Sequence, residues 1–94
     1  MRRVRWAFRA RRDFIRITDY YSSVAPSYPD ALLDKIDGIA LSLSEQPGRG
    51  PQVEGTPYHK LLLQGTDYIL LYKATRRELI IARVRHAKED WRPR

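Results

Sequence analysis

A chain of 94 residues with no cysteine and a net charge of +7 predicts one domain, residues 1–94, and excludes several classes of protein. Without cysteine there is no disulfide framework and no thiolate metal site, which suits a reducing cytoplasm. No apolar run is long enough to span a membrane, and a strand pattern follows the basic N-terminus in place of a secretion signal. The positive charge favours an acidic partner, either nucleic acid, an acidic protein or a membrane surface.

The first half of the chain predicts one strand and two helices. Val4, Trp6 and Phe8 alternate with smaller or charged residues, as in a strand with one apolar face. Apolar residues then recur at steps of three and four, first from residue 10 to 24 and again from 32 to 43, which is typical of amphipathic helices. Ser27 and Asp30 approximate a capping box at the start of the second helix. The short connection predicts an antiparallel helix hairpin.

Three strands close the sequence after a loop rich in glycine and proline at residues 46–57. They are expected at residues 58–64, 68–74 and 78–86, and the short turns between them make neighbouring strands antiparallel. The order is therefore β-α-α-β-β-β. It predicts an α+β fold, an antiparallel sheet with a two-helix hairpin packed on one face.

The last three strands are apolar on both faces, although two helices can cover only one. We assign the helices to the more uniformly apolar set, which is Leu61, Leu63, Tyr68, Leu70, Tyr72, Ile80, Ala82 and Val84. The other set is Leu62, Ile69, Leu71, Leu79 and Ile81, bordered by Lys60, Lys73, Arg83 and Arg85. Five aliphatic side chains left in water would forgo on the order of 10 kcal/mol, so something should cover them. An acidic, amphipathic partner segment fits this face, and the alternatives are the C-terminal tail with Trp91 or a second copy of the chain.

Three stretches resemble the ParE/RelE family of toxins. The opening strand runs into an arginine-rich helix at residues 4–13, residues 65–72 (GTDYILLY) resemble the family's turn and central strand, and residues 80–86 (IIARVRH) resemble its last strand. The loop at residues 47–50 fits as well. The resemblance implies a growth-inhibiting, cytoplasmic toxin with a RelE/ParE-like fold, which a cognate ParD-like antitoxin holds inactive. The antitoxin-binding candidates are Leu62, Ile69, Leu71, Lys73, Leu79, Ile81, Arg83 and Arg85.

The family implies two mechanisms. ParE-like members bind and poison DNA gyrase, whereas RelE-like members cut mRNA on the ribosome without a metal. Cleavage needs an acid, a base and cations, and the candidates here are His86, Arg83, Arg85 and Lys60. RelE-like nucleases usually carry an arginine where this chain has Ile69, so the nuclease set is incomplete. We expect a binding toxin that inhibits gyrase, without cofactor, metal or membrane, and keep the mRNA endonuclease as the alternative.

Arginines gather in the first strand and helix and predict a surface that docks on the target. The candidates are Arg5, Arg9, Arg12 and Arg16, together with Trp91. The plainer interpretation is a solvated helix face, and for His86, Tyr68 and Tyr72 it is ordinary packing. A third hypothesis, a basic nucleic-acid-binding module, predicts a continuous cationic stripe with exposed aromatic side chains. The aromatic residues occupy mainly core-like positions of the pattern, which disfavours this hypothesis.

Overall fold

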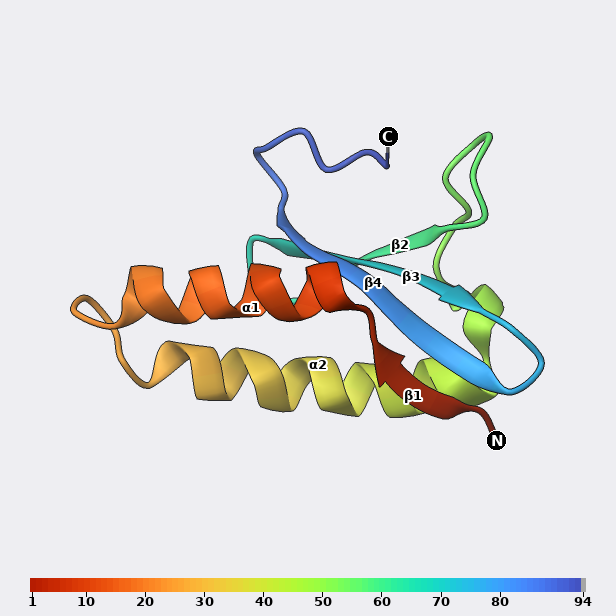
Figure 1. The fold of residues 1–94 in the computed structure, drawn as a ribbon, viewed down its shortest axis with the longest axis horizontal. Coiled ribbons are helices and arrows are strands. Elements are labelled where there is room, and N and C mark those ends of the chain that lie inside the picture. The colour runs from red at the N-terminus through yellow and green to blue at the C-terminus, as the bar shows by residue number, and fades with distance from the viewer. Residues whose placement is uncertain (94) are drawn as a thin grey trace.

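The computed structural model describes residues 1–93 and has the expected order of elements (Figure 1). Two helices and four strands are joined by short connections, with one 3₁₀ turn in the glycine- and proline-rich loop. The elements are β1 (Arg3–Trp6), α1 (Phe8–Tyr21), α2 (Tyr28–Glu45), η1 (Pro47–Arg49), β2 (His59–Leu62), β3 (Tyr68–Ala74) and β4 (Glu78–His86). Within residues 1–93, no helix combines the length and the apolarity needed to cross a membrane.

The sheet is mixed, with the strand order β1-β4-β3-β2. β2, β3 and β4 form antiparallel neighbours, as their short turns predict. β1 instead pairs in parallel with β4, so that Arg3 lies opposite Glu78. The expectation of a wholly antiparallel sheet therefore fails only at β1. Two helices separate β1 from the other strands in the sequence. A long connection of this kind allows either strand direction, whereas a hairpin turn makes its two strands antiparallel.

Two local details differ from the sequence pattern. β1 ends at Trp6, and Phe8 begins α1 with its side chain 72% exposed, although alternation placed it on the apolar face of the strand. Ser27 precedes α2 but makes no capping hydrogen bond through its side chain, so the expected capping box is absent. Pro29 lies in the first turn of α2, as expected, where its missing N–H costs nothing.

The core lies between the helix hairpin and one face of the sheet (Figure 1). Tyr68 and Tyr72 are buried in it, as the packing interpretation predicts. The Tyr72 hydroxyl accepts a hydrogen bond from the Gly50 N–H at 2.9 Å and donates one to the Pro47 carbonyl at 2.8 Å. These two bonds satisfy a buried polar group and fasten the loop after α2 to the central strand.

A β-bulge interrupts the regular pairing of β3 with β4. Leu71 pairs with Arg83 and the next residue, Tyr72, pairs with Ile81, so Ala82 has no partner across the ladder. An extra residue of this kind bends the strand and breaks the alternation of faces along it. Positions before and after Ala82 therefore cannot be assigned to faces by one parity.

The bulge reverses four of our face assignments. Leu79 and Ile81, expected on the open face, are completely buried against the helices, and Val84 lies nearly buried in the same core. Ile80 and Ala82, expected under the helices, instead line the open face. Both predictions were wrong because they assumed strict alternation along β4, and one extra residue shifts every side chain on one side of it to the other face.

Candidate functional site

The C-terminal segment, residues 87–93, folds back over the face of the sheet opposite the helices (Figure 1). Arg85 holds it, because its Nε lies 3.2 Å from a Glu89 carboxylate oxygen and its Nη2 donates to the Asp90 carbonyl at 3.0 Å. The Lys60 ammonium lies 4.5 Å from the centre of the Trp91 ring. The tail with Trp91, one of the three coverings considered for this face, thus occupies part of it.

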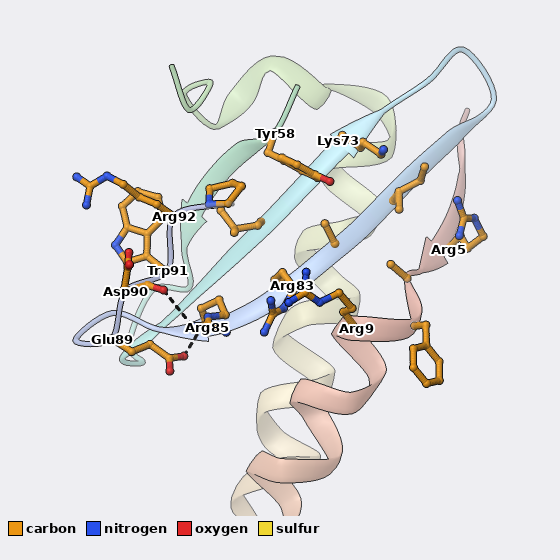
Figure 2. A pocket seen from close by; sticks show the side chains of 16 residues that line it. Arg5, Arg9, Tyr58, Lys73, Arg83, Arg85, Glu89, Asp90, Trp91 and Arg92 are labelled. Atoms are coloured by element: carbon orange, nitrogen blue, oxygen red, sulfur yellow. Dashed lines mark hydrogen bonds and ion pairs between the residues drawn. The ribbon is translucent and has the colours of Figure 1, made fainter. Parts of the chain in front are cut away.

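A groove of about 660 Å³ remains between this tail and the junction of β1 with α1 (Figure 2). Its floor is apolar and comes from β3 and β4, with Leu71, Ile80 and Ala82. Leu71 and Ile80 are nearly fully buried by their neighbours, so the floor is a packed surface and not five bare aliphatic side chains. Phe8 forms part of the wall opposite the tail.

Most charged side chains around the groove are cationic. The lining cations are Arg5, Arg9, Lys73, Arg83, Arg85 and Arg92. The lining acids, Glu89 and Asp90, both belong to the tail, and the Glu89 carboxylate already faces Arg85. An apolar floor with a cationic rim suits a ligand that is amphipathic and acidic.

Arg83 joins the groove to α1 through an ion pair with Asp13. Its Nε and Nη2 donate to the two carboxylate oxygens at 2.7 and 2.9 Å, and the Val84 N–H donates a third bond at 3.0 Å. The hydrogen bond that Arg83 donates to Asp13 raises the pKa of Arg83 above its ordinary value. The main role of Arg83 is therefore structural, because its guanidinium links β4 to α1.

His86 lies at the other end of β4, beyond the groove. Its ring meets Tyr68 edge-on at 5.4 Å between centroids, and its Nδ1 accepts a hydrogen bond from the Lys88 N–H at 3.2 Å. Burial raises the pKa of the Tyr68 hydroxyl above its ordinary value. A small hollow of about 190 Å³ beside His86 is lined also by Arg16 and Arg85.

The four candidates for RNA cleavage do not form one cluster. His86 and Arg85 share the small hollow, but Lys60 and Arg83 do not line it. Lys60 faces Trp91, Arg83 is held by Asp13, and Arg85 by Glu89. Within residues 1–93, no group of three histidine, cysteine or carboxylate side chains is placed to hold a metal ion.

Of the antitoxin-binding candidates, Leu71, Lys73, Arg83 and Arg85 line the groove. Leu62 and Ile69 pair with each other on the same face of the sheet but outside the groove, with Leu62 57% exposed and Ile69 buried. Leu79 and Ile81 lie in the core, and they are withdrawn from the set because no partner can reach them in the folded chain.

Several groove residues were missed by sequence reasoning. Tyr58, Ile80 and Ala82 were not among the candidates, and Arg5 and Arg9 were assigned only to target docking. Nothing in the sequence pattern marks the bulge that turns Ile80 and Ala82 toward the groove. The sequence pattern also gives no sign of the parallel pairing of β1 with β4, which brings Arg5 to the rim of the groove.

Comparison with known proteins agrees with this fold. In a structure described as the chromosomal ParDE TA system from P. aeruginosa, one chain superposes with a TM-score of 0.77 at 20% identity, covering 94% of this chain and 98% of that chain. YafQ from E. coli strain BL21(DE3) superposes with a TM-score of 0.51 at 17% identity, and a histidine-to-glutamine variant of E. coli YafQ with 0.55 at 15%. Each YafQ match covers 92% of this chain and 93% of the other.

The β-α-α-β-β-β chain thus has an α+β fold that it shares with the ParDE and YafQ structures. The family model described as "ParE toxin of type II toxin-antitoxin system, parDE" matches residues 4–91. The chain therefore belongs to the ParE toxin family. A search of curated proteins found no match.

Proposed function

We propose that this chain is a ParE-like toxin that acts in the cytoplasm by binding and inhibiting DNA gyrase, and that a cognate antitoxin neutralises it. Membership of the ParE family supports the choice of target. The observation that supports a binding mechanism is that the arginines which a nuclease would need already face carboxylates of this chain. Arg83 is held in two hydrogen bonds by Asp13, and Arg85 lies against Glu89. Ile69, where an RNA-cleaving relative would carry an arginine, is buried and apolar.

Gyrase inhibition is tested with purified components. Gyrase supercoils a relaxed plasmid in the presence of ATP, and we expect the chain to stop supercoiling and to accumulate cleaved plasmid. The control is a translation extract that contains ribosomes and a reporter mRNA, in which the mRNA should stay intact. Unimpaired supercoiling together with cut mRNA would reverse the choice between the two mechanisms.

We further propose that the groove receives an acidic, amphipathic segment of the antitoxin. Leu71, Ile80 and Ala82 offer an apolar floor, while Lys73 and Arg85 are among the cations around it. Complementary charge of this kind steers association and suppresses wrong partners. The tail wall gives the groove two sides, which favours an elongated ligand over a flat surface.

The groove is tested by co-expression with the proposed cognate antitoxin. Lys73→Glu reverses a charge in the groove, whereas Arg76→Glu reverses an exposed charge in the turn between β3 and β4, outside it. We expect the Lys73 variant to lose co-purification and the Arg76 variant to retain it. Equal co-purification of both variants would move the antitoxin to another surface.

The alternative, mRNA cleavage on the ribosome, has one observation in its favour, because His86 and Arg85 line the same hollow beside Arg16. A general acid or base there would need a free imidazole nitrogen and a nearby cation. Under the gyrase proposal, His86→Ala leaves growth inhibition unchanged after induction in cells. Loss of inhibition by the folded His86 variant would favour the nuclease.

A further inference from the structure

The outward surface of α1 carries large apolar and aromatic side chains that the fold leaves in water. Phe8 is 72% exposed, Ile15 60% and Tyr20 70%. Ile17 and Ala10, on the opposite side of the helix, are buried in the core. Figure 1 shows α1 extending past the strands, with α2 on one side of it. The exposed surface is therefore a free helix ridge, which neither the sheet nor α2 covers.

A row of arginines follows this ridge. Arg9, Arg12 and Arg16 are spaced by three and four residues, which places them on one side of the helix, about 10 Å from first to last at 1.5 Å per residue. All three are exposed. The Arg12 guanidinium lies 5.9 Å from the centre of the Phe8 ring, so an exposed aromatic side chain abuts the row.

The acid within this row is turned away from the surface. Asp13 lies between Arg12 and Arg16 along α1, but its carboxylate points inward to Arg83 and the Val84 N–H and is almost fully buried. The ion pairs among residues 1–93 include none of the arginines of the row. The exposed acid of α1 is Asp19, three residues after Arg16, so the ridge presents three cations against one acid.

We propose that this ridge, formed by Arg9, Arg12, Arg16, Phe8 and Tyr20, docks on the backbone of duplex DNA. Duplex DNA carries one negative charge per about 3.4 Å of axis on each strand, so a 10 Å row of three arginines spans about three phosphates of one strand. A convex helix fits the major groove of B-form DNA, which is about 12 Å wide. The deep, narrow major groove of an RNA duplex does not admit it, and single strands favour concave channels.

An acidic protein is the competing partner for the same charges. Such a partner is already matched by the groove, which adds an apolar floor to its cations. The ridge lacks a concave floor, and its cations repeat at helical spacing, as suits a regular row of phosphates. Arg12, Arg16 and Tyr20 do not line the groove, whereas Phe8 and Arg9 belong to both surfaces, so the ridge and the groove adjoin at the start of α1. Substitutions of Arg12 and Arg16 therefore test the ridge without removing a side chain of the groove.

The experiment measures binding of the full chain to a fluorescently labelled DNA duplex of about two helical turns by anisotropy, between about 50 and 200 mM salt. The logarithm of the association constant should fall linearly with that of the salt concentration, at about −0.9 per phosphate contact. We expect Arg12→Ala/Arg16→Ala to flatten the slope by about 1.8. Arg12→Lys/Arg16→Lys keeps the charges and should keep most of the slope.

The matched control is Arg76→Ala/Arg77→Ala, which removes two exposed arginines from the turn between β3 and β4. It should leave the slope nearly unchanged. Equal flattening by both double variants would show that only the net charge of +7 acts, and would overturn the proposal. So would a wild-type chain that binds no duplex at low salt. A poly-glutamate peptide that binds as tightly as the duplex, and loses affinity in the same variant, would assign the ridge to an acidic protein instead.

Discussion

Replacing Asp13 by alanine should destabilise the fold by ~3 kcal/mol, because α1 then loses its polar link to β4. The carboxylate accepts two hydrogen bonds from Arg83 and one from the Val84 N–H. The side chains of Asp13 and Arg83 are 9% and 18% exposed, so water can replace few of these bonds. Breaking a buried pair from one side costs about 3–5 kcal/mol, and the partial exposure of Arg83 places the expected value at the lower end.

Urea unfolding at pH 7, followed by tryptophan fluorescence, measures this loss against a total stability of roughly 5–14 kcal/mol for a chain of this size. A double-mutant cycle with Arg83→Ala should give a coupling energy above about 1.5 kcal/mol. A coupling below about 0.5 kcal/mol would refute the reasoning, since the pair would then behave like an exposed one. Arg5→Ala is the comparison, because the Arg5–Glu78 pair is 49% and 32% exposed and should contribute less than about 1 kcal/mol.

Three further predictions concern stability. Gly50→Ala should lower the free energy of unfolding, measured with urea, by about 2 kcal/mol or more, because the new Cβ would collide with the Lys60 carbonyl and lie 2.8 Å from the Tyr72 hydroxyl. An unchanged stability would mean that this loop can shift. Gly38→Ala should instead raise the free energy of unfolding by about 1 kcal/mol, since it lies within α2 and, apart from its chain neighbours and the adjacent helix backbone, no atom lies within 4 Å of the new Cβ. A loss of stability would show that the new methyl group does not fit there. The pKa of Tyr68 is raised by burial above the ordinary 10.0, so its contribution to stability is complete below pH 10 and is lost as the pH rises further. The urea midpoint should therefore fall above pH 10, and the fall should be shallower in Tyr68→Phe; parallel curves for the two proteins would contradict the assignment.

The elements themselves could be predicted from the sequence because each has a strong local signal. Alternation bounded by short polar turns placed β3 at residues 68–74 and β4 at 78–86, and the structure confirms both ranges. Steps of three and four placed both helices, and the two-residue error at Phe8 lies at an element boundary, where propensity decides little. The cationic rim could also be anticipated, since Lys73 and Arg85 follow aliphatic stretches in the sequence.

The missing parts of the site depend on contacts that local patterns do not encode. Asp13 and Arg83 are 70 residues apart, and no spacing rule joins them. The parallel attachment of β1, which brings Arg5 to the groove, follows from how the helix hairpin crosses the sheet. The exposed positions of Phe8 and Tyr20 depend on which side of α1 meets the core. These two side chains are the exposed aromatic neighbours of the arginines that the sequence pattern had not indicated, and on that ground nucleic-acid binding had been disfavoured.

The bulge at Ala82 also bears on chain length. Because Leu71 already pairs with Arg83 and Tyr72 with Ile81, the ladder closes without Ala82, and β4 holds one residue more than its hydrogen bonds need. A chain that lacked this residue would keep Ile81 under the helices and would straighten the strand at the point where Arg83 turns toward α1. A residue gained or lost here would therefore change both the charge offered at the groove and the ion pair of Arg83 with Asp13, so recognition and stability are coupled at this position.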